Sequence, residues 1–290
     1  MTIVQLEYLL AVVNSGNFSR AAELCFVTQP SLSLQIKNLE EELGVVLLDR
    51  TRKPVIPTEI GAVVIENARE ALRACGYIAE SVKELKDEVS GTLRLAVIPT
   101  VAAYMLPRII GKFTAACPKV ELEVSEMSAS EIKESLLRDR IDAAIVSGGD
   151  FGSMIEYELF NDTFFAYVSN SHPLAARGAI RLDDIPMRDM VLLREGYCLR
   201  DQVIDLFSAK RMAKPMHKFS CASLESVMRI VDATGGLTII PEMVTKFISG
   251  SKRRQIKILA KGALSRKISL VVRRTYVKGS IITALREIIK

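Results

Sequence analysis

One cysteine lies in a segment whose residue types can do redox chemistry. Cys198 follows the apolar run 190–193 and precedes Arg200 by two residues. A neighbouring cation favours the thiolate over the thiol, and the thiolate is the form that attacks peroxides, disulfides and other electrophiles. The alternative is that Cys198 is a small buried hydrophobic residue, which is the commoner use of a lone cysteine. The rest of the chain must decide between these two interpretations.

Composition indicates a globular protein of two or three domains. The chain has 290 residues, of which 49% are hydrophobic and 25% charged. Its five cysteines contain no CxxC pair, which argues against a disulfide framework or a structural zinc site and favours the reducing cytoplasm. No signal-like start and no run of eighteen apolar residues is present, so we expect no membrane segment, and the sequence suggests no metal or cofactor.

In the first sixty residues, the apolar positions are spaced as in a small helical DNA-binding domain. Apolar residues at spacings of three and four predict a helix that Ser15-Gly16-Asn17 ends, and a second short helix begins at about Ser19. Thr28 is expected to cap a third helix, whose first turn tolerates Pro30. The buried face of this third helix is predicted to consist of Leu32, Ile36, Leu39 and Leu43.

Helix, turn and polar helix together are typical of a helix-turn-helix. Its N-terminal polar side chains can reach base edges, and the cationic tip after it, 50–53, can contact phosphates. An ordinary helical bundle beside a solvated charged loop is the alternative, and acidic residues outnumber basic ones over residues 1–90. The candidate DNA-binding residues are Arg20, Thr28, Gln29, Pro30, Ser31, Ser33, Gln35, Arg50, Thr51, Arg52 and Lys53.

A single long helix is predicted from Thr58 to about Val89. Its apolar stripe is close to a heptad seam, which a solitary helix has no reason to carry. We expect it to pair with the same helix of a second subunit, and a dimer also suits a helix-turn-helix that reads two half-sites.

Beyond Ser90-Gly91, short apolar runs alternate with segments of helix length. This pattern predicts an α/β region with mixed sheets, including strands at 164–168 and 190–193. Ligands in such folds bind beyond the carboxyl ends of strands. Three strand ends are expected to face one cleft, at 98–100, 147–149 and 193–198.

Several runs carry a family resemblance. The segments FSRAA at 18–22, TQPSLS at 28–33, LEEELG at 39–44 and LDRT at 48–51, with Thr58 and Gly61 after them, resemble LysR-type transcriptional regulators. Within that family, IPT at 98–100, EGYCLRDQ at 195–202 and ASLE at 222–225 resemble the members that sense hydrogen peroxide. The resemblance extends over essentially the whole chain.

The resemblance implies an architecture and partners. It implies a winged helix-turn-helix at 1–57, a dimerising linker helix at 58–89 and a regulatory region at 90–290. That region would have two α/β subdomains like those of a periplasmic binding protein, about 90–161 plus 267–290 and 162–266. The implied assembly is a homodimer that forms a homotetramer on double-stranded promoter DNA and contacts RNA polymerase.

The resemblance also implies roles for individual residues, and at several of these positions the sequence differs from the family pattern. Cys198 would be the cysteine that hydrogen peroxide oxidises. The place of a second, resolving cysteine holds Phe207, followed by Ser208, which leaves Cys221 as the nearest remaining cysteine. Tyr197 stands where a histidine is usual, and Ser128 or Ser130 would replace a threonine missing at Ala129. The implied peroxide pocket is Thr100, Ser128, Tyr197, Arg200, Asp201 and Arg266.

Two other functions remain open at this point. A regulator of the same family can respond to a small molecule bound between its regulatory subdomains, without redox chemistry. An enzyme using Cys198 with His172 or His217 as base is disfavoured, because neither histidine lies in a nucleophile motif. Both histidines are expected in surface turns. The sequence leaves open the target promoters, activation versus repression, and whether oxidation ends in a disulfide or a sulfenic acid.

Overall fold

The chain divides into two compact units in the computed structural model, Met1–Lys86 and Asp87–Lys290. The structure describes residues 1–84, 89–207, 219–260, 264–274, 276 and 279–289. Ser208 and His217, singled out from the sequence, lie outside these residues. No helix in the described ranges is long and apolar enough to cross a bilayer.

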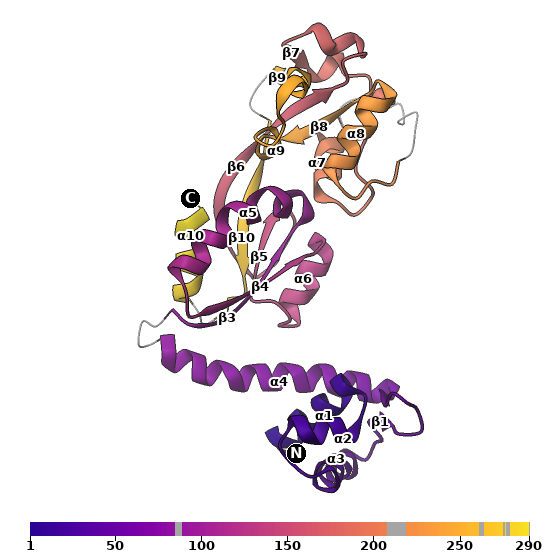
Figure 1. Ribbon diagram of the computed structural model, residues 1–290, viewed down its shortest axis with the longest axis vertical. Helices are drawn as coiled ribbons and strands as arrows, with labels where there is room; N and C mark the ends of the chain where they lie inside the picture. Colours follow the sequence, from indigo (N-terminus) through magenta and orange to yellow (C-terminus); the bar gives the residue numbers. More distant parts are fainter. Residues whose placement is uncertain (85–88, 208–218, 261–263, 275, 277–278, 290) are drawn as a thin grey trace. The chain divides into compact units, whose positions relative to one another are not determined.

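Three short helices form the core of the N-terminal unit: α1 Ile3–Ser15, α2 Phe18–Leu24 and α3 Gln29–Leu43 (Figure 1). Side-chain oxygens cap the start of each helix. Thr28 accepts from the Ser31 N–H, which confirms the predicted cap, and Asn17 accepts from Ser19 and Arg20, so α2 begins slightly earlier than expected. Polar caps thus set where each of these helices begins.

The third helix packs largely as predicted. Leu32, Ile36 and Leu39 are fully buried against α1 and α2. Leu43 is 38% exposed, so its predicted burial is wrong. It is the last residue of α3, and Gly44 then takes a left-handed conformation that turns the chain away from the core.

A two-stranded wing follows and leads into a long helix. Strand β1 Leu48–Asp49 pairs antiparallel with β2 Ile56–Pro57, and α4 runs over Glu59–Glu84. The start of α4 is held against the wing, because the Thr58 hydroxyl donates to the Val46 carbonyl and its backbone N–H donates to that of Leu47. The predicted long helix is confirmed up to Glu84.

The second unit is built on one mixed sheet whose order is β4-β3-β5-β10-β6-β9-β7, with β8 also paired to β6. Strands β3, β4 and β5 are parallel to one another, whereas β10 runs antiparallel to β5 and β6. The strands are β3 Gly91–Val97, β4 Val120–Glu126, β5 Ala143–Ser147, β6 Ile155–Val168, β7 Ala179–Arg181, β8 Leu237–Pro241, β9 Ile256–Ala260 and β10 Ser265–Val272.

Strand β6 runs through both halves of this sheet. Its first part, up to Thr163, pairs with β10, and its second part, 164–168, pairs with β8 and β9. The predicted strand at 164–168 is therefore the end of a longer one. The predicted strand at 190–193 is wrong as a regular strand: Met190 and Leu193 are buried but form only isolated bridges, to Leu237 and Cys221.

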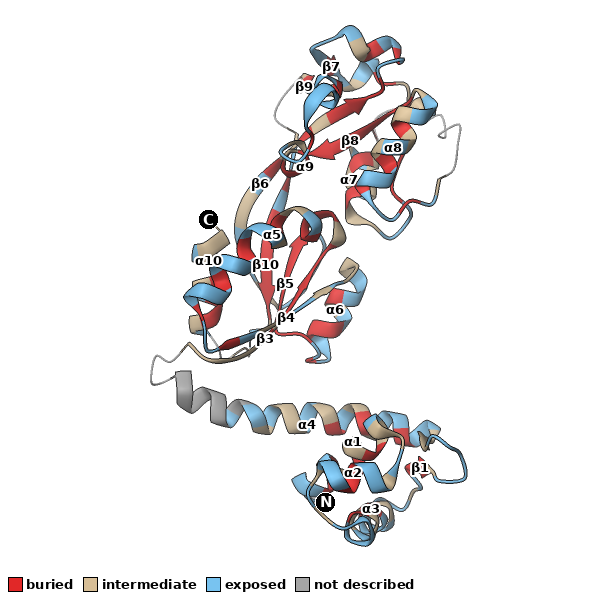
Figure 2. Cartoon of the chain, viewed as in Figure 1, coloured by how far each residue is buried: buried red, intermediate tan, exposed pale blue. Residues whose placement is uncertain are grey.

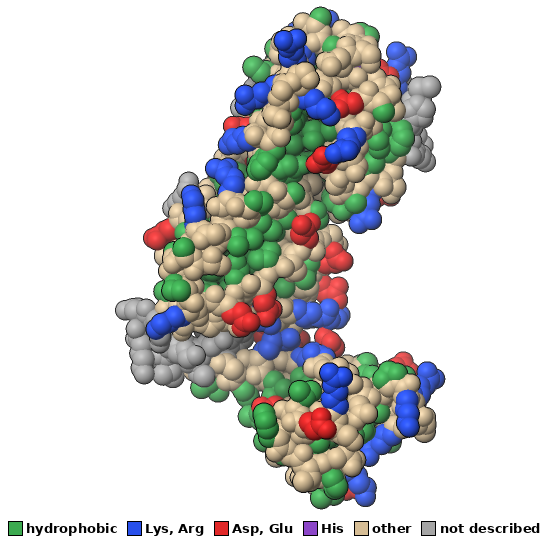
Figure 3. Space-filling model, in the orientation of Figure 1, with side chains coloured by type: hydrophobic (Ala, Val, Ile, Leu, Met, Phe, Trp, Pro, Cys, Tyr) green, Lys and Arg blue, Asp and Glu red, His purple; other side chains and the backbone are tan. Residues whose placement is uncertain are grey.

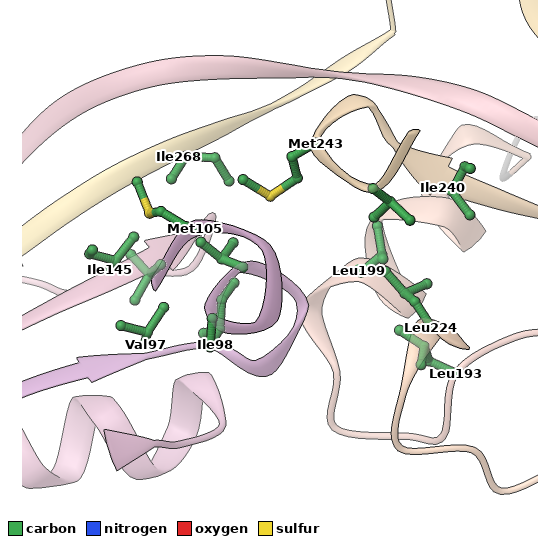
Figure 4. Packing of buried hydrophobic residues seen from close by; sticks show 14 of the residues in the cluster. Val97, Ile98, Met105, Ile145, Leu193, Leu199, Leu224, Ile240, Met243 and Ile268 are labelled. Atoms are coloured by element: carbon green, nitrogen blue, oxygen red, sulfur yellow. The ribbon is translucent and has the colours of Figure 1, made fainter. Parts of the chain in front are cut away.

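Helices cover the sheet and bury its central strands (Figure 2). The helices are α5 Pro99–Ala116, α6 Ala129–Leu137, α7 Cys198–Leu206, α8 Leu224–Thr234, α9 Glu242–Thr245 and α10 Gly279–Ile289. Short 3-10 helices lie at Pro173–Ala176, Leu182–Asp184, Met187–Asp189 and Gly250–Gln255. One apolar cluster extends through the unit, from Val97 and Met105 to Leu199 and Leu224 (Figure 4).

Candidate functional site

Three helices begin at one pocket. Thr100 lies in the first turn of α5, Ala129 is the first residue of α6, and Cys198 is the first residue of α7. The unpaired backbone N–H groups at helix starts create positive potential, which favours anions and thiolates. The pocket has a volume of about 260 Å³ and is lined by Ile98, Pro99, Thr100, Glu126, Met127, Ser128, Ala129, Glu131, Arg194, Gly196, Tyr197 and Cys198.

Cys198 is half-buried at this pocket, and its thiol has a raised pKa. Burial is the largest cause, and the carboxylate of Asp201 adds to it. A backbone N–H at the start of α7 and the cation of Arg266 act in the opposite direction and lower the pKa. The balance of these effects leaves the group mostly a thiol at neutral pH.

Arg200 makes its contacts away from the Cys198 thiol. Its guanidinium Nη1 donates to the Leu193 carbonyl at 2.9 Å and its Nη2 lies 3.7 Å from Glu195 Oε1. Arg200, Asp201 and Arg266 are all absent from the residues that line the pocket. On a helix, residues two apart point in different directions, so proximity in sequence to Cys198 did not mean proximity of the side chains. The cation that acts on the thiol is Arg266.

Arg266 is buried behind the pocket and holds Thr100. Its Nη1 donates to Thr100 Oγ1 at 3.0 Å and its Nη2 to the Thr100 carbonyl at 3.2 Å. Nε and Nη2 also donate to Asp162 Oδ2. Thr100 is only 6% exposed, so the arginine fixes its hydroxyl at the pocket wall. The structure thereby brings Thr100, Arg266 and Cys198 together.

Ser128 and Tyr197 also line the pocket, as the resemblance implied. The Ser128 hydroxyl caps α6, where it donates to Glu131 Oε2 and accepts from the Glu131 N–H, while Ser130 is exposed and outside the lining. The Tyr197 ring lies 5.2 Å below the Arg194 guanidinium. Of the expected cleft segments, 147–149 does not line the pocket. Ser147 instead accepts two hydrogen bonds from Gln202 of α7.

Cys221, Phe207 and His172 are all buried. Cys221 is 8% exposed, and its carbonyl accepts from the Arg194 N–H. Phe207 is 2% exposed and ends α7 inside the core. His172 is 6% exposed, and its Nδ1 accepts from the Leu174 N–H, so the expectation of a surface turn is wrong. It serves as the cap of a 3-10 helix.

Sequence reasoning missed Asp162, Met243, Gln202 and Arg194. Asp162 and Met243 carry no motif, and their roles follow from strand register and helix packing. Gln202 ends the recognised segment 195–202 and Arg194 adjoins it, so these two had a signal in the sequence although no role was given to them. A metal site is absent from the described residues, which contain no group of three or more His, Cys, Asp or Glu side chains placed to hold an ion.

The N-terminal unit presents most of its candidate DNA-binding residues to solvent. Arg20, Thr28, Gln29, Pro30, Ser31 and Thr51 to Lys53 are exposed, and Figure 3 shows Lys and Arg side chains along one edge of this unit. Ser33 is partly buried, as is Gln35, whose Oε1 accepts from Gln5 at 3.3 Å.

Arg50 has a structural partner within the unit. It donates to Glu40 Oε2 at 2.7 Å and lies 5.1 Å from the Phe18 ring centroid. Glu40 also accepts from the Leu47 and Leu48 N–H groups. Arg50 therefore helps to hold the wing, in addition to any contact with DNA.

Comparison with known proteins identifies the family. Residues 3–62 match the family described as bacterial regulatory helix-turn-helix protein, lysR family, and residues 86–290 match the LysR substrate binding domain. The chain belongs to the LysR family. It is thus a DNA-binding helix-turn-helix regulator with a substrate-binding-type regulatory region.

Individual relatives give more specific information about function than the family models do. The chain is 35% identical over 277 residues to a hydrogen peroxide-inducible genes activator of Haemophilus influenzae, covering 94% of this chain and 91% of the relative. It is 34% identical over 244 residues to the DNA-binding transcriptional dual regulator OxyR of Escherichia coli K12, covering 84% and 80%. The chain is therefore similar in sequence to regulators that are named for hydrogen peroxide induction or as OxyR.

Three solved structures are similar to this chain over 99% or more of its length. A full-length OxyR cysteine variant from Pseudomonas aeruginosa superposes with a TM-score of 0.77 at 25% identity, covering 100% of this chain and 97% of that one. A Corynebacterium glutamicum OxyR mutant with bound hydrogen peroxide gives 0.66 at 26% identity, covering 99% and 91%. CbnR in complex with its target DNA, at 22% identity and a TM-score of 0.56, covers 100% of both chains and shares the fold.

Proposed function

We propose that this LysR-family regulator senses hydrogen peroxide by oxidation of Cys198. The observation that carries the proposal is the pocket at the start of α7, where the half-buried Cys198 thiol and Thr100 both form part of the wall. Arg266 holds the Thr100 hydroxyl in place by a hydrogen bond. Relatives described as hydrogen peroxide-inducible genes activators support it.

The chemistry at this site is a two-electron oxidation of sulfur. The Cys198 thiolate attacks one peroxide oxygen, so that an S–O bond forms as the O–O bond breaks. Sulfur is oxidised to sulfenic acid, and the second oxygen leaves as hydroxide, which takes up the proton released when the Cys198 thiol ionises and becomes water. The Thr100 hydroxyl and the start of α7 face the charge that develops on the departing oxygen.

Oxidation then changes the packing at the start of α7. A polar oxygen appears where a thiol lay, beside Tyr197 and Thr100. The product is a sulfenic acid or a disulfide with Cys221, because Phe207 occupies the place of a resolving cysteine. Either product biases a two-state regulatory region, and α4 transmits the change to the DNA readers.

The assembly that we propose is a homodimer through α4 that forms a homotetramer on promoter DNA in the cytoplasm and acts on RNA polymerase. The candidate DNA-binding residues read the promoter through the start of α3 and the wing. The divisions at 57/58 and 89/90, and of the regulatory region at about 161/162 and 266/267, are part of this proposal. Strand β6 crosses the division at about 161/162 and β10 crosses the one at about 266/267, which suits a hinge between the two subdomains.

Mass spectrometry of the five thiols tests the redox proposal. Reduced protein receives a brief, near-stoichiometric pulse of hydrogen peroxide in the presence of a sulfenic-acid trap. We expect selective modification of Cys198, and its product distinguishes a bare sulfenic acid from a disulfide with Cys221. Reaction of Cys198 no faster than that of Cys75 or Cys117 contradicts peroxide sensing, as does peroxide-dependent activation that survives Cys198→Ser.

A second candidate function is a response to a small molecule without redox chemistry. The pocket favours it by size, since about 260 Å³ exceeds what one peroxide molecule fills, and by the three helix starts that attract an anion. A small carboxylate that raises the melting temperature of Cys198→Ser as much as that of wild type supports this function.

A further inference from the structure

A buried carboxylate, Asp162, stands opposite Arg266 in the sheet. The two residues are direct cross-strand partners on β6 and β10, and their side chains are 2% and 1% exposed. Arg266 Nε and Nη2 donate to Asp162 Oδ2 at 3.1 and 3.0 Å, and Asp162 Oδ1 accepts from the Met243 N–H at 3.1 Å. Both carboxylate oxygens therefore have donors, and the pair joins β6, β10 and α9.

The other donors of the same guanidinium hold Thr100. Because Arg266 Nη1 donates to Thr100 Oγ1, the threonine oxygen acts as an acceptor and its own hydrogen is available for another partner. Thr100 lines the pocket that contains Cys198. A continuous set of hydrogen bonds thus runs from Asp162 through Arg266 to the hydroxyl at the pocket wall.

We infer that Asp162 is a positioning residue for the reaction of Cys198 with hydrogen peroxide. This inference rests on the proposed function. Asp162 is not among the residues that line the pocket, so it acts through Arg266. It balances the buried charge of the arginine and fixes the guanidinium in the orientation that presents Nη1 to Thr100. The Thr100 hydrogen is thereby directed into the pocket, where the departing peroxide oxygen collects charge.

The amide variant Asp162→Asn is a sharp test because asparagine cannot reproduce the pattern. An amide offers one acceptor oxygen, whereas Asp162 accepts from Arg266 with one oxygen and from Met243 with the other. Either the Arg266 contacts or the Met243 contact must be lost, and in both orientations the neutral amide no longer balances the buried charge of the guanidinium. Glu156→Gln is the matched control: it makes the same chemical change on the same strand, at a carboxylate that pairs with Lys267 of β10 at 2.9 Å, outside the pocket.

The experiment compares two reactions of Cys198 in the full-length protein. The first is the second-order rate of sulfenic acid formation with hydrogen peroxide. The second is alkylation by iodoacetamide across pH, which gives the thiol pKa and the intrinsic reactivity of the thiolate without a departing oxygen. We expect Asp162→Asn to slow the peroxide reaction by roughly 10- to 100-fold, at or below the effect of removing one direct donor. Alkylation by the thiolate should change less than about twofold, and Glu156→Gln should leave both rates unchanged.

Three outcomes overturn the inference: an unchanged peroxide rate in Asp162→Asn, an equal loss in both reactions, or an equal loss in Glu156→Gln. If Asp162→Asn does not fold by circular dichroism, Asp162→Glu takes its place. It keeps the charge but displaces the guanidinium by a methylene group, so the same selective loss is expected and a wild-type peroxide rate refutes positioning. A wild-type Cys198 that does not react with peroxide refutes the proposed function instead, which separates the two failures.

Discussion

Gly61 offers a test of how the wing is held against the long helix. A Cβ at this position would lie 1.9 Å from the Leu47 carbonyl oxygen and 2.9 Å from both the Leu47 carbonyl carbon and Thr58 Oγ1. Leu47 cannot move freely, because its oxygen also accepts the Thr58 N–H at 3.0 Å. Gly61→Ala must therefore separate the start of α4 from the segment that leads into β1.

Two effects oppose each other in this substitution. Replacing a helical glycine by alanine stabilises a helix by about 1 kcal/mol. Forcing a methyl group into a filled site costs about 1–3 kcal/mol, and the displaced Thr58 to Leu47 hydrogen bond adds about 1 kcal/mol. Leu47 and Leu48 are fully buried and would also lose contacts. We expect a net loss of about 1–3 kcal/mol from the N-terminal unit.

Gly76 provides the control within the same helix. No atom lies within 4 Å of a Cβ built there, so Gly76→Ala should be neutral or stabilising by about 1 kcal/mol. Thermal unfolding of both variants, followed by the helical circular dichroism signal, gives the difference. DNA affinity should fall for Gly61→Ala alone, since the wing shifts. A Gly61→Ala protein as stable as Gly76→Ala refutes the steric reasoning.

Three further predictions concern the pocket and the DNA surface. Asp201→Asn removes a negative charge that raises the pKa of Cys198, so the thiolate fraction and the peroxide rate at pH 7 should rise, and the pH midpoint of iodoacetamide alkylation should move down. Lys53→Ala should weaken DNA binding for all sequences alike and reduce the slope of log affinity against log salt by about 1; an unchanged slope means that this exposed cation contacts no phosphate. Phe207→Cys empties a buried site and should cost about 3–5 kcal/mol in urea unfolding, so a stable variant with a peroxide-induced disulfide at 198–207 contradicts the buried position of Phe207.

Local signals in the sequence were enough for the helical unit. Thr28 and Pro30 mark the start of α3 because caps and first-turn prolines act within a few residues. The strand at 190–193 failed for the opposite reason. A short apolar run is compatible with any buried conformation, and its bridges to Leu237 and Cys221, which are distant in sequence, determine what it becomes.

The surroundings of Cys198 depended on contacts that sequence distance hides. Asp162 and Arg266 are 104 residues apart and meet because β6 and β10 pair in a particular register. Arg200, two residues from the thiol, points to Leu193 instead. The resemblance pointed to Arg266, which the structure places against Thr100, but nothing in the chain's local pattern pointed to Asp162.

The raised pKa of Cys198 determines where the selectivity for peroxide must arise. A thiol that burial and Asp201 keep largely protonated at neutral pH reacts slowly with general electrophiles, because little thiolate is present. Fast oxidation then requires groups that stabilise the transition state more than the resting thiol. Thr100 and the start of α7 meet that requirement, since they face the pocket where charge develops on the departing oxygen. An electrophile such as iodoacetamide, whose leaving group is large and needs no proton, gains little from them. Arg266 and Asp162 therefore control the ratio of the peroxide rate to the iodoacetamide rate, rather than the pKa of the thiol.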